Sequence, residues 1–164
     1  MKMGLIRHAE AVDIGEAGTT NDYDRMLTEH GREQAQALAT SLQRLGIVPG
    51  LILSSPLVRA WQTAEIVAAT LTPGREPMHC QRLASGERRF NKLTKEVIEF
   101  NQPLTFLVGH MPDIGDFAAW LLGSSECSID FDKSAMALIK FANEPEKAGG
   151  ELKWLVTPAW FDPS

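Results

Sequence analysis

Short apolar runs alternate along the chain with longer segments whose apolar residues recur at helical spacing. The runs predict buried strands, because polar or turn residues bound them and they are too short for helices; they cover residues 3–6, 51–53, 77–81 and 104–108. The longer segments predict helices over residues 28–45, 56–71, 91–100 and the stretch between His110 and Gly123. Such alternation is typical of a mainly parallel sheet covered on both faces. We therefore predict a three-layer α/β/α sandwich, completed by an antiparallel C-terminal hairpin of residues 135–141 and 151–157.

Residues that flank two of these helices refine their boundaries. Thr28 is a predicted N-cap for the first helix and Gly46 is its predicted stop. Pro56 is expected in the first turn of the second helix, where its missing N–H would be unpaired anyway. Residues 12–25 are polar and predict a long surface loop, and loops of that length are more often functional than idle. Residues 82–90 predict another loop.

Composition narrows the class of protein. The 164 residues suit one domain spanning 1–164, and 16 basic against 21 acidic residues give a net charge of −5. That charge argues against nucleic-acid partners and against binding to anionic membranes, although a small basic site remains compatible with it. Cys80 and Cys127 have no CxxC partner, so neither a zinc knuckle nor a secretory disulfide framework is expected. With no signal-peptide core or membrane-spanning run, we expect a cytoplasmic protein; its oligomeric state stays open.

Four basic side chains follow the predicted strands. Arg7 and His8 end the first strand, Arg59 follows the second through Ser54-Ser55-Pro56, and His110 follows the strand over 104–108. Ligand sites of parallel sheets lie at the carboxyl ends of the strands, so these side chains should meet at one edge. Cations gathered on an acidic protein indicate an anionic ligand, and arginine matches phosphate oxygens bidentately. The N-terminus of the following helix would add N–H donors, so a phosphoryl group is the expected occupant.

Each of these residues alone would more often be structural, and only their joint placement favours a site. A single histidine at a strand end is usually hydrogen-bonded to backbone, and a single arginine usually forms a surface ion pair. His30 lies within a predicted helix and His79 within a predicted strand, and no other candidate site residue accompanies either of them. We expect both of them to be structural.

Four segments resemble, in order, the signatures of the histidine phosphatase superfamily, also called phosphoglycerate mutase-like. They span residues 5 to 112 and comprise Leu-Ile-Arg-His-Ala-Glu at 5–10, Leu-Thr-Glu-His-Gly-Arg-Glu-Gln-Ala at 27–35, Ser-Ser-Pro-Leu-Val-Arg-Ala-Trp-Gln-Thr-Ala at 54–64 and Val-Gly-His-Met-Pro at 108–112. The short chain leaves no room for a large helical insertion. It is therefore most similar to the SixA branch of phosphohistidine phosphatases.

The resemblance implies a metal-independent phosphatase with no cofactor. His8 would be the nucleophile that forms a phosphohistidine intermediate, while Arg7, Arg59 and His110 would bind the phosphoryl oxygens. The two arginines would also disfavour a protonated, non-nucleophilic imidazole. The implied substrate is a phosphohistidine protein, with a small phosphomonoester as the alternative.

Two positions depart from the family pattern. Ala9 stands where the family usually has glycine, which restricts the backbone after His8. The family places an acidic proton donor after the third strand, where Glu87 is the best positional match. Glu10, Asp13 and Asp22 compete for that role, and an exposed Glu87 paired with Arg88 or Arg89 is an equal alternative.

Two other classes of function stay open at this point. A non-catalytic phosphate-binding module would not need a nucleophilic imidazole, which argues against that class. A metal hydrolase using His8, Glu10 and His110 lacks the ligand spacing of known zinc sites.

Overall fold

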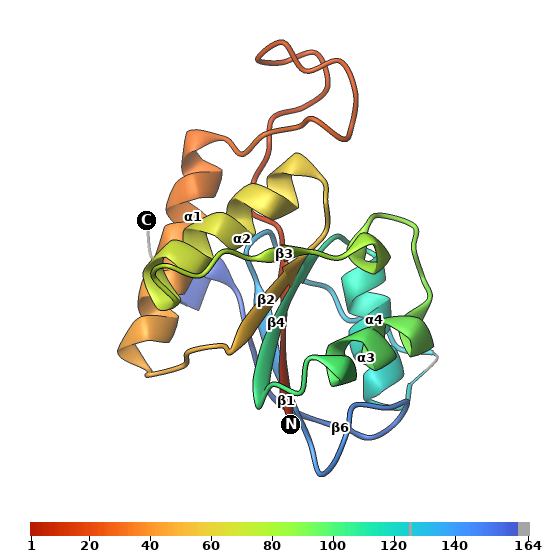
Figure 1. Cartoon of the computed structure of the whole chain (residues 1–164). Helices are drawn as coiled ribbons and strands as arrows, with labels where there is room; N and C mark the ends of the chain where they lie inside the picture. Colours follow the sequence, from red (N-terminus) through yellow and green to blue (C-terminus); the bar gives the residue numbers. More distant parts are fainter. Residues whose placement is uncertain (125, 161–164) are drawn as a thin grey trace.

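The apolar runs of the sequence form a single sheet in the computed structural model, which describes residues 1–124 and 126–160 (Figure 1). Within these residues the strand order is β3-β2-β4-β1-β5-β6. Strands β1 to β4 run parallel, while β5 is antiparallel to both β1 and β6. The strands are β1 (Lys2–Arg7), β2 (Leu51–Ser54), β3 (Met78–His79), β4 (Leu104–Gly109), β5 (Met136–Phe141) and β6 (Gly150–Val156).

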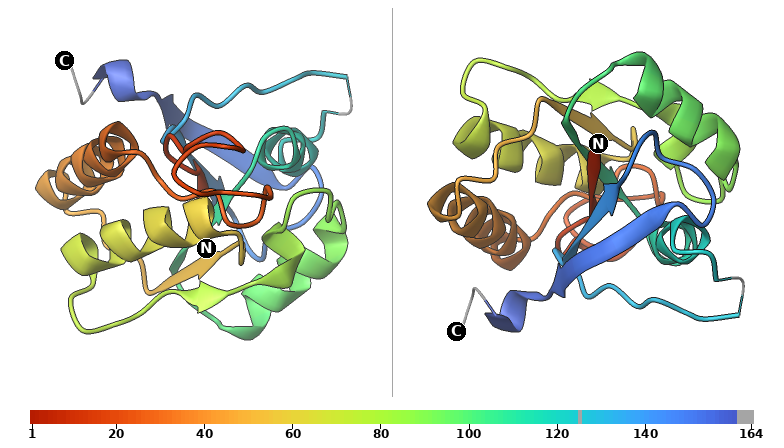
Figure 2. Two further views of the ribbon diagram at one scale, coloured as in Figure 1. Left: turned by 90° about the horizontal axis from the view of Figure 1, so that it is seen from above. Right: turned by 90° about the horizontal axis from the view of Figure 1, so that it is seen from below.

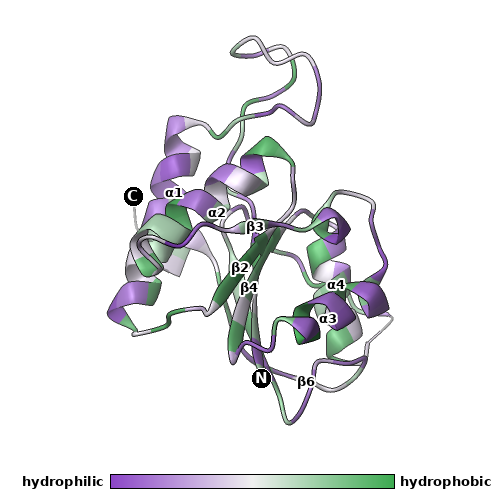
Figure 3. Cartoon of the chain, in the orientation of Figure 1, coloured by the Kyte–Doolittle hydropathy of each residue, from purple (hydrophilic) through white to green (hydrophobic). Residues whose placement is uncertain are grey.

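Helices cover both faces of this sheet, as Figure 1 shows. They are α1 (Glu29–Arg44), α2 (Val58–Leu71), α3 (Phe90–Glu99) and α4 (Asp113–Leu121). One apolar cluster joins α1 and α2 to the sheet, and a second joins α3 and α4 to the opposite face. In Figure 3 the apolar colouring is concentrated on β2 and β4 between these helix layers. The predicted three-layer α/β/α sandwich with an antiparallel C-terminal hairpin is therefore confirmed.

Two helix boundaries follow the sequence signals and one does not. The Thr28 hydroxyl accepts the Gly31 N–H at 2.9 Å, and Gly46 adopts φ 66° just after α1, as predicted. The expectation for Pro56 is wrong, because α2 begins only at Val58. Ser55 Oγ accepts the Leu57 N–H at 3.3 Å, and this hydrogen bond holds Pro56 in a turn before the helix.

The third strand is shorter than its apolar run suggests. Only Met78–His79 pairs with β2, and the chain then enters a short 3-10 helix (Gln81–Leu83). Met78 and His79 are both exposed, and the His79 ring stacks on Trp61 with centroids 3.8 Å apart. This ring contact joins the exposed edge strand to α2.

The predicted polar loop of residues 12–25 is closed at its base by a small ladder. Ala11 and Leu27 form an antiparallel bridge, and the Val12 N–H donates to the Met26 carbonyl at 2.9 Å. Below it, the Thr28 hydroxyl donates to Glu10 Oε1 at 2.8 Å. The loop projects beyond the carboxyl ends of the central strands (Figure 1), and the view from above places it over them (Figure 2, left).

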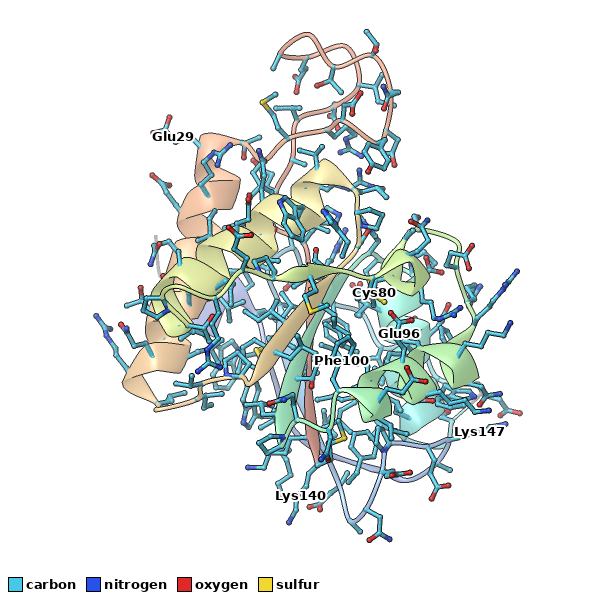
Figure 4. The ribbon with its side chains drawn as sticks, in the orientation of Figure 1. Glu29, Cys80, Glu96, Phe100, Lys140 and Lys147 are labelled. Carbon is cyan, nitrogen blue, oxygen red and sulfur yellow. The ribbon has the colours of Figure 1, made fainter. Side chains whose placement is uncertain are left out.

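Both cysteines are free thiols. Cys80 lies beside Glu96 of α3 (Figure 4); burial raises the pKa of this thiol to about 12, and the neighbouring carboxylate adds to the effect. The thiol therefore stays protonated and unreactive. In the described parts of the chain, no helix combines the length and apolar character required to cross a bilayer.

Candidate active site

The first and fourth strands bring two histidines to one edge of the sheet. Strands β1 and β4 are neighbours, with Arg7 opposite Gly109, so His8 and His110 leave the sheet side by side. The His8 N–H donates to the Gly109 carbonyl at 3.0 Å. Their ring centroids lie 5.1 Å apart, and both side chains are buried. The predicted convergence of these residues is therefore present in the structure.

The hydrogen bonds of His8 define its tautomer. Nδ1 lies 2.7 Å from the Ala9 carbonyl oxygen, which can only accept, so Nδ1 carries the proton. Nε2 consequently keeps its lone pair. Arg59 Nε donates to this lone pair at 3.3 Å, a long contact that leaves the nitrogen weakly engaged.

Both histidines are held neutral. Burial lowers the pKa of His8 to about 3, and the positive charges of Arg59 and Arg7 add to the effect. Burial likewise lowers the pKa of His110 to about 4, with Arg59 and Arg7 as further causes. At neutral pH the Nε2 atom of His8 is therefore an unprotonated nitrogen in a positive environment, which is the state needed for nucleophilic attack.

Arg59 stands next to His8 in the first turn of α2. It is 5% exposed, and burial lowers its pKa from the usual value without removing its charge. Its Nη1 and Nη2 donate to the Asp22 carbonyl oxygen at 2.6 Å and to Asp22 Oδ2 at 3.0 Å. Thr63 links the backbone of Arg59 to that of Ala9, because its hydroxyl donates to the Arg59 carbonyl and accepts the Ala9 N–H.

The remaining basic residues each have a buried nitrogen without a hydrogen-bond partner. His110 Nε2 lies 2.7 Å from Ser55 Oγ, while its Nδ1 has no partner among the described residues. Arg7 Nη1 donates to the Phe131 carbonyl at 2.6 Å, and its Nε is unpaired within the same residues. A buried polar group without a partner costs about 1–3 kcal/mol. Both nitrogens are fully buried, so a ligand oxygen would reach them only after a movement of the side chains.

Glu87 lies near this edge but outside the cluster of His8, Arg59 and His110. The adjacent Gly86 N–H donates to Asp113 Oδ2 at 2.7 Å, which places the loop beside the segment that follows His110. The Glu87 carboxylate itself faces Arg89, with 3.8 Å between Oε2 and Nε. Within the described part of the chain, no hydrogen bond or ion pair joins the Glu87 side chain to the three clustered residues.

The competing carboxylates occupy three different environments. Glu10 accepts from Thr28 and supports the start of α1. Asp13 is exposed and pairs with Arg25 at 3.3 Å. Asp22 alone reaches Arg59. Partial burial would raise the pKa of Asp22, but hydrogen bonds from Arg25 and Arg59 outweigh that effect and lower it. An ionised Asp22 is poorly suited to donate a proton at neutral pH.

Sequence reasoning missed several supporting contacts. Ser55 contacts His110 and Thr63 contacts the Ala9 N–H. Both residues lie in the segment 54–64 beside the predicted site, so their hydroxyl groups could have been predicted to support it. The Phe131 carbonyl that binds Arg7 comes from an irregular segment with no such signal. Ala9 has no positive φ, so the missing glycine causes no backbone strain there. His30 and His79 lie on the surface, as expected of structural residues.

Histidines at a sheet edge could also serve as metal ligands. Among the residues that the structure describes, no three His, Cys, Asp or Glu side chains gather as ligands of one ion would. The basic residues that do gather carry donors suited to an oxyanion.

Comparison with known proteins places the chain among phosphatases. An uncharacterized protein of Picosynechococcus sp. is 33% identical over 99% of this chain and 100% of its own length. Serine/threonine-protein phosphatase Pgam5 of Drosophila ananassae is 37% identical over 50% of this chain; the match spans only 27% of Pgam5. The structure of the protein histidine phosphatase SixA complexed with tungstate superposes with a TM-score of 0.83 at 22% identity, covering 97% of this chain and 98% of SixA.

The family assignment rests on the sequence itself. The family model described as histidine phosphatase superfamily (branch 1) matches residues 3–99, which include Arg7, His8 and Arg59. That match covers more than half of the chain, and the Picosynechococcus relative matches nearly all of it. This chain therefore belongs to the histidine phosphatase superfamily.

Proposed function

We propose that this protein is a phosphohistidine phosphatase that works through a covalent phosphohistidine on His8. The family and the SixA-like fold support phosphatase activity, and the covalent mechanism rests on one observation. His8 presents an unprotonated Nε2 beside the Arg59 guanidinium, with a pKa lowered to about 3. A site that only bound phosphate would gain more from a charged imidazolium than from a neutral ring.

The reaction would proceed in two displacements on phosphorus. In the first, the Nε2 lone pair of His8 forms the N–P bond while the bond to the leaving group breaks. In the second, water attacks phosphorus, the N–P bond breaks, and inorganic phosphate leaves with His8 neutral again. Phosphoryl transfer asks the protein mainly for positioning and for stabilisation of the equatorial oxygens.

Three residues would supply that stabilisation. Arg59 already lies beside Nε2, and Arg7 and His110 each have a buried nitrogen that lacks a partner among the described residues. The Ser55 hydroxyl can donate to His110 Nε2, so that Nδ1 would carry the ring proton, and a small movement of both side chains would turn these donors to the phosphoryl oxygens. These donors would take the place that a divalent cation holds in many phosphoryl-transfer enzymes. We therefore propose that neither metal nor cofactor takes part.

Glu87 remains our candidate for the proton donor, with Glu10, Asp13 and Asp22 as the alternatives. Its loop would have to turn the carboxylate from Arg89 towards His8. A phosphohistidine substrate would depend little on this group, because solvent can protonate the leaving nitrogen before the P–N bond breaks. The position of Glu87 away from the cluster is compatible with such a substrate.

A phosphoprotein is the substrate that the surroundings of the site favour. SixA is described as a protein histidine phosphatase and Pgam5 as a serine/threonine-protein phosphatase, so both are named for phosphoprotein substrates. The loop over the site exposes Ile14 at 58%, Tyr23 at 50% and Met26 at 38%, apolar area that a protein surface could cover. We propose a cytoplasmic location, since the two free cysteines suit a reducing compartment, and a role in signal transduction would follow from a phosphoprotein substrate.

A side-by-side substrate panel tests this proposal. Phosphohistidine peptide, phosphoserine peptide, nitrophenyl phosphate and small alkyl phosphates are compared with wild type, His8→Ala and His30→Ala, the last altering an exposed histidine on α1. We expect phosphohistidine to be hydrolysed fastest, His8→Ala to be inactive and His30→Ala to match wild type. Alkaline quench should trap acid-labile phosphate on His8, and chelator should leave the rate unchanged.

Each arm of the panel has an outcome against the proposal. Activity of His8→Ala within tenfold of wild type would exclude the covalent mechanism. Faster turnover of a small phosphomonoester than of phosphohistidine peptide would assign the protein to the small-molecule class. Phosphate binding without turnover of any substrate would indicate a binding module.

A further inference from the structure

The loop over the active site accepts hydrogen bonds from the start of α2, where Arg59 contacts His8. Arg59 donates to Asp22 twice, and the backbone N–H of Val58, at the start of α2, donates to the Tyr23 carbonyl at 3.1 Å. Residues 22 and 23 therefore occupy three donors at the start of α2.

The geometry of the guanidinium locates the Asp22 carboxylate relative to the nucleophile. Arg59 Nε donates to His8 Nε2 at 3.3 Å, while Nη1 and Nη2 donate to Asp22 at 2.6 and 3.0 Å. All three nitrogens of the guanidinium are therefore engaged, one by the nucleophile and two by Asp22. A phosphoryl group entering towards Nε2 meets a guanidinium whose Nη donors Asp22 already holds.

Asp22 has a second anchor that could hold it away from Arg59. Its Oδ1 accepts from Arg25 Nη1 at 3.1 Å, and Arg25 also contacts Asp13 and the Val12 carbonyl. The Asp22 side chain is 51% exposed, whereas that of Arg59 is only 6% exposed. The carboxylate is thus the movable partner of the pair, and Arg25 can retain it when it leaves Arg59.

We infer that Asp22 is an internal competitor for the phosphoryl group, occupying the Nη2 donor of Arg59 in the empty site and giving it up when phosphate binds. This inference rests on the proposed function and adds a determinant of affinity to it. An ionised carboxylate next to the site also repels an anionic phosphate. Asp22 therefore weakens the binding of substrate phosphate and favours release of the product.

The test compares phosphate binding to two variants with the same change of charge. Asp22→Asn keeps the shape of the side chain and removes its charge. Asp24→Asn removes a charge two residues away, where the carboxylate pairs with Asn21 and does not contact Arg59. Calorimetric titration with inorganic phosphate and inhibition by orthovanadate give the affinities. Asp22→Ser is a second replacement, and thermal unfolding confirms that each variant is folded.

The expected result is tighter phosphate binding in Asp22→Asn by roughly 3- to 5-fold, the size expected for releasing one partly exposed ion pair. KM should fall by a similar factor, while Asp24→Asn stays within about twofold of wild type. Equal affinities in Asp22→Asn and Asp24→Asn would overturn the inference. Weaker binding in Asp22→Asn and Asp22→Ser would assign Asp22 to holding Arg59 in place.

This design distinguishes a failure of the inference about Asp22 from a failure of the proposed function. If Asp22→Asn binds phosphate more tightly but wild type hydrolyses no substrate, the proposed function fails and the competitor role stands. If wild type hydrolyses phosphohistidine peptide but phosphate binding does not tighten, the competitor role alone fails.

Discussion

Acidification from pH 7 to pH 5 should destabilise this protein through two buried side chains. Burial lowers the pKa of His8 to about 3 and that of His110 to about 4, whereas an unfolded histidine titrates near 6.5. Between these values the unfolded chain binds protons that the folded chain does not. The free energy of unfolding therefore carries no penalty from these histidines above pH 6.5, and it decreases as the pH drops from there towards 4.

The size of the effect follows from the same values. Each pH unit below the unfolded pKa costs 1.36 kcal/mol per histidine, so about 2 kcal/mol is lost per histidine at pH 5. The pair together accounts for about 4 kcal/mol, a large part of the roughly 5–15 kcal/mol that stabilises a typical domain. The lowered pKa of Asp22 adds to this loss of stability only near pH 4 and below, because unfolded aspartate titrates there.

Urea unfolding followed by tryptophan fluorescence in phosphate-free buffer measures this difference. Wild type, His8→Gln and the exposed control His30→Gln are compared at pH 7 and pH 5. His8→Gln should lose about 2 kcal/mol less of its free energy of unfolding between pH 7 and pH 5 than wild type does. The control His30→Gln should lose as much as wild type. An identical loss in all three proteins would refute the argument that buried neutral histidines cause the acid sensitivity.

Three further variants probe the site and its support. Arg59→Ala should lower kcat on the order of 10²-fold, as the loss of one preorganised donor does, and activity within threefold of wild type would contradict its proposed role. Gly31→Ala would place a methyl group against the Glu10 carbonyl oxygen, so the free energy of unfolding should fall by about 2 kcal/mol or more, whereas Glu33→Ala on the exposed face of α1 should change it little. Glu87→Gln should slow alkyl phosphates by about 10²-fold or more and barely affect nitrophenyl phosphate or phosphohistidine; equal small effects on all three would remove Glu87 as the proton donor.

The architecture and the basic cluster were predictable because each depends on a local pattern. Apolar runs such as residues 104–108 can be buried only as central strands, and parallel strands bring their carboxyl ends to one edge. Arg7 and His8 at one strand end and His110 at another therefore had to approach each other. The boundary at Pro56 failed for a local reason, since the Ser55 hydroxyl supplied a turn that competed with the first helical turn.

Contacts made by irregular segments were beyond pattern reasoning. The approach of Asp22 to Arg59 depends on the path of residues 12–25, where neither periodicity nor caps constrain the backbone. The binding of Arg7 by the Phe131 carbonyl depends on a turn in which Ser134 adopts φ 64°. Ser134 donates its N–H to the carbonyls of Arg7 and His8, a backbone interaction that no residue type encodes.

The ladder at the base of the long loop makes that loop an exchangeable part. The bridge between Ala11 and Leu27, with the bond from Thr28 to Glu10 below it, holds the two ends together whatever chain lies between them. Closing a loop of twice the length costs only about 0.6 kcal/mol more. Residues 14–21 can thus be lengthened or replaced while His8 and the start of α1 keep their positions. Grafting a foreign sequence there, with Asp22 and Tyr23 retained for their contacts to Arg59 and Val58, should redirect which phosphorylated surface docks.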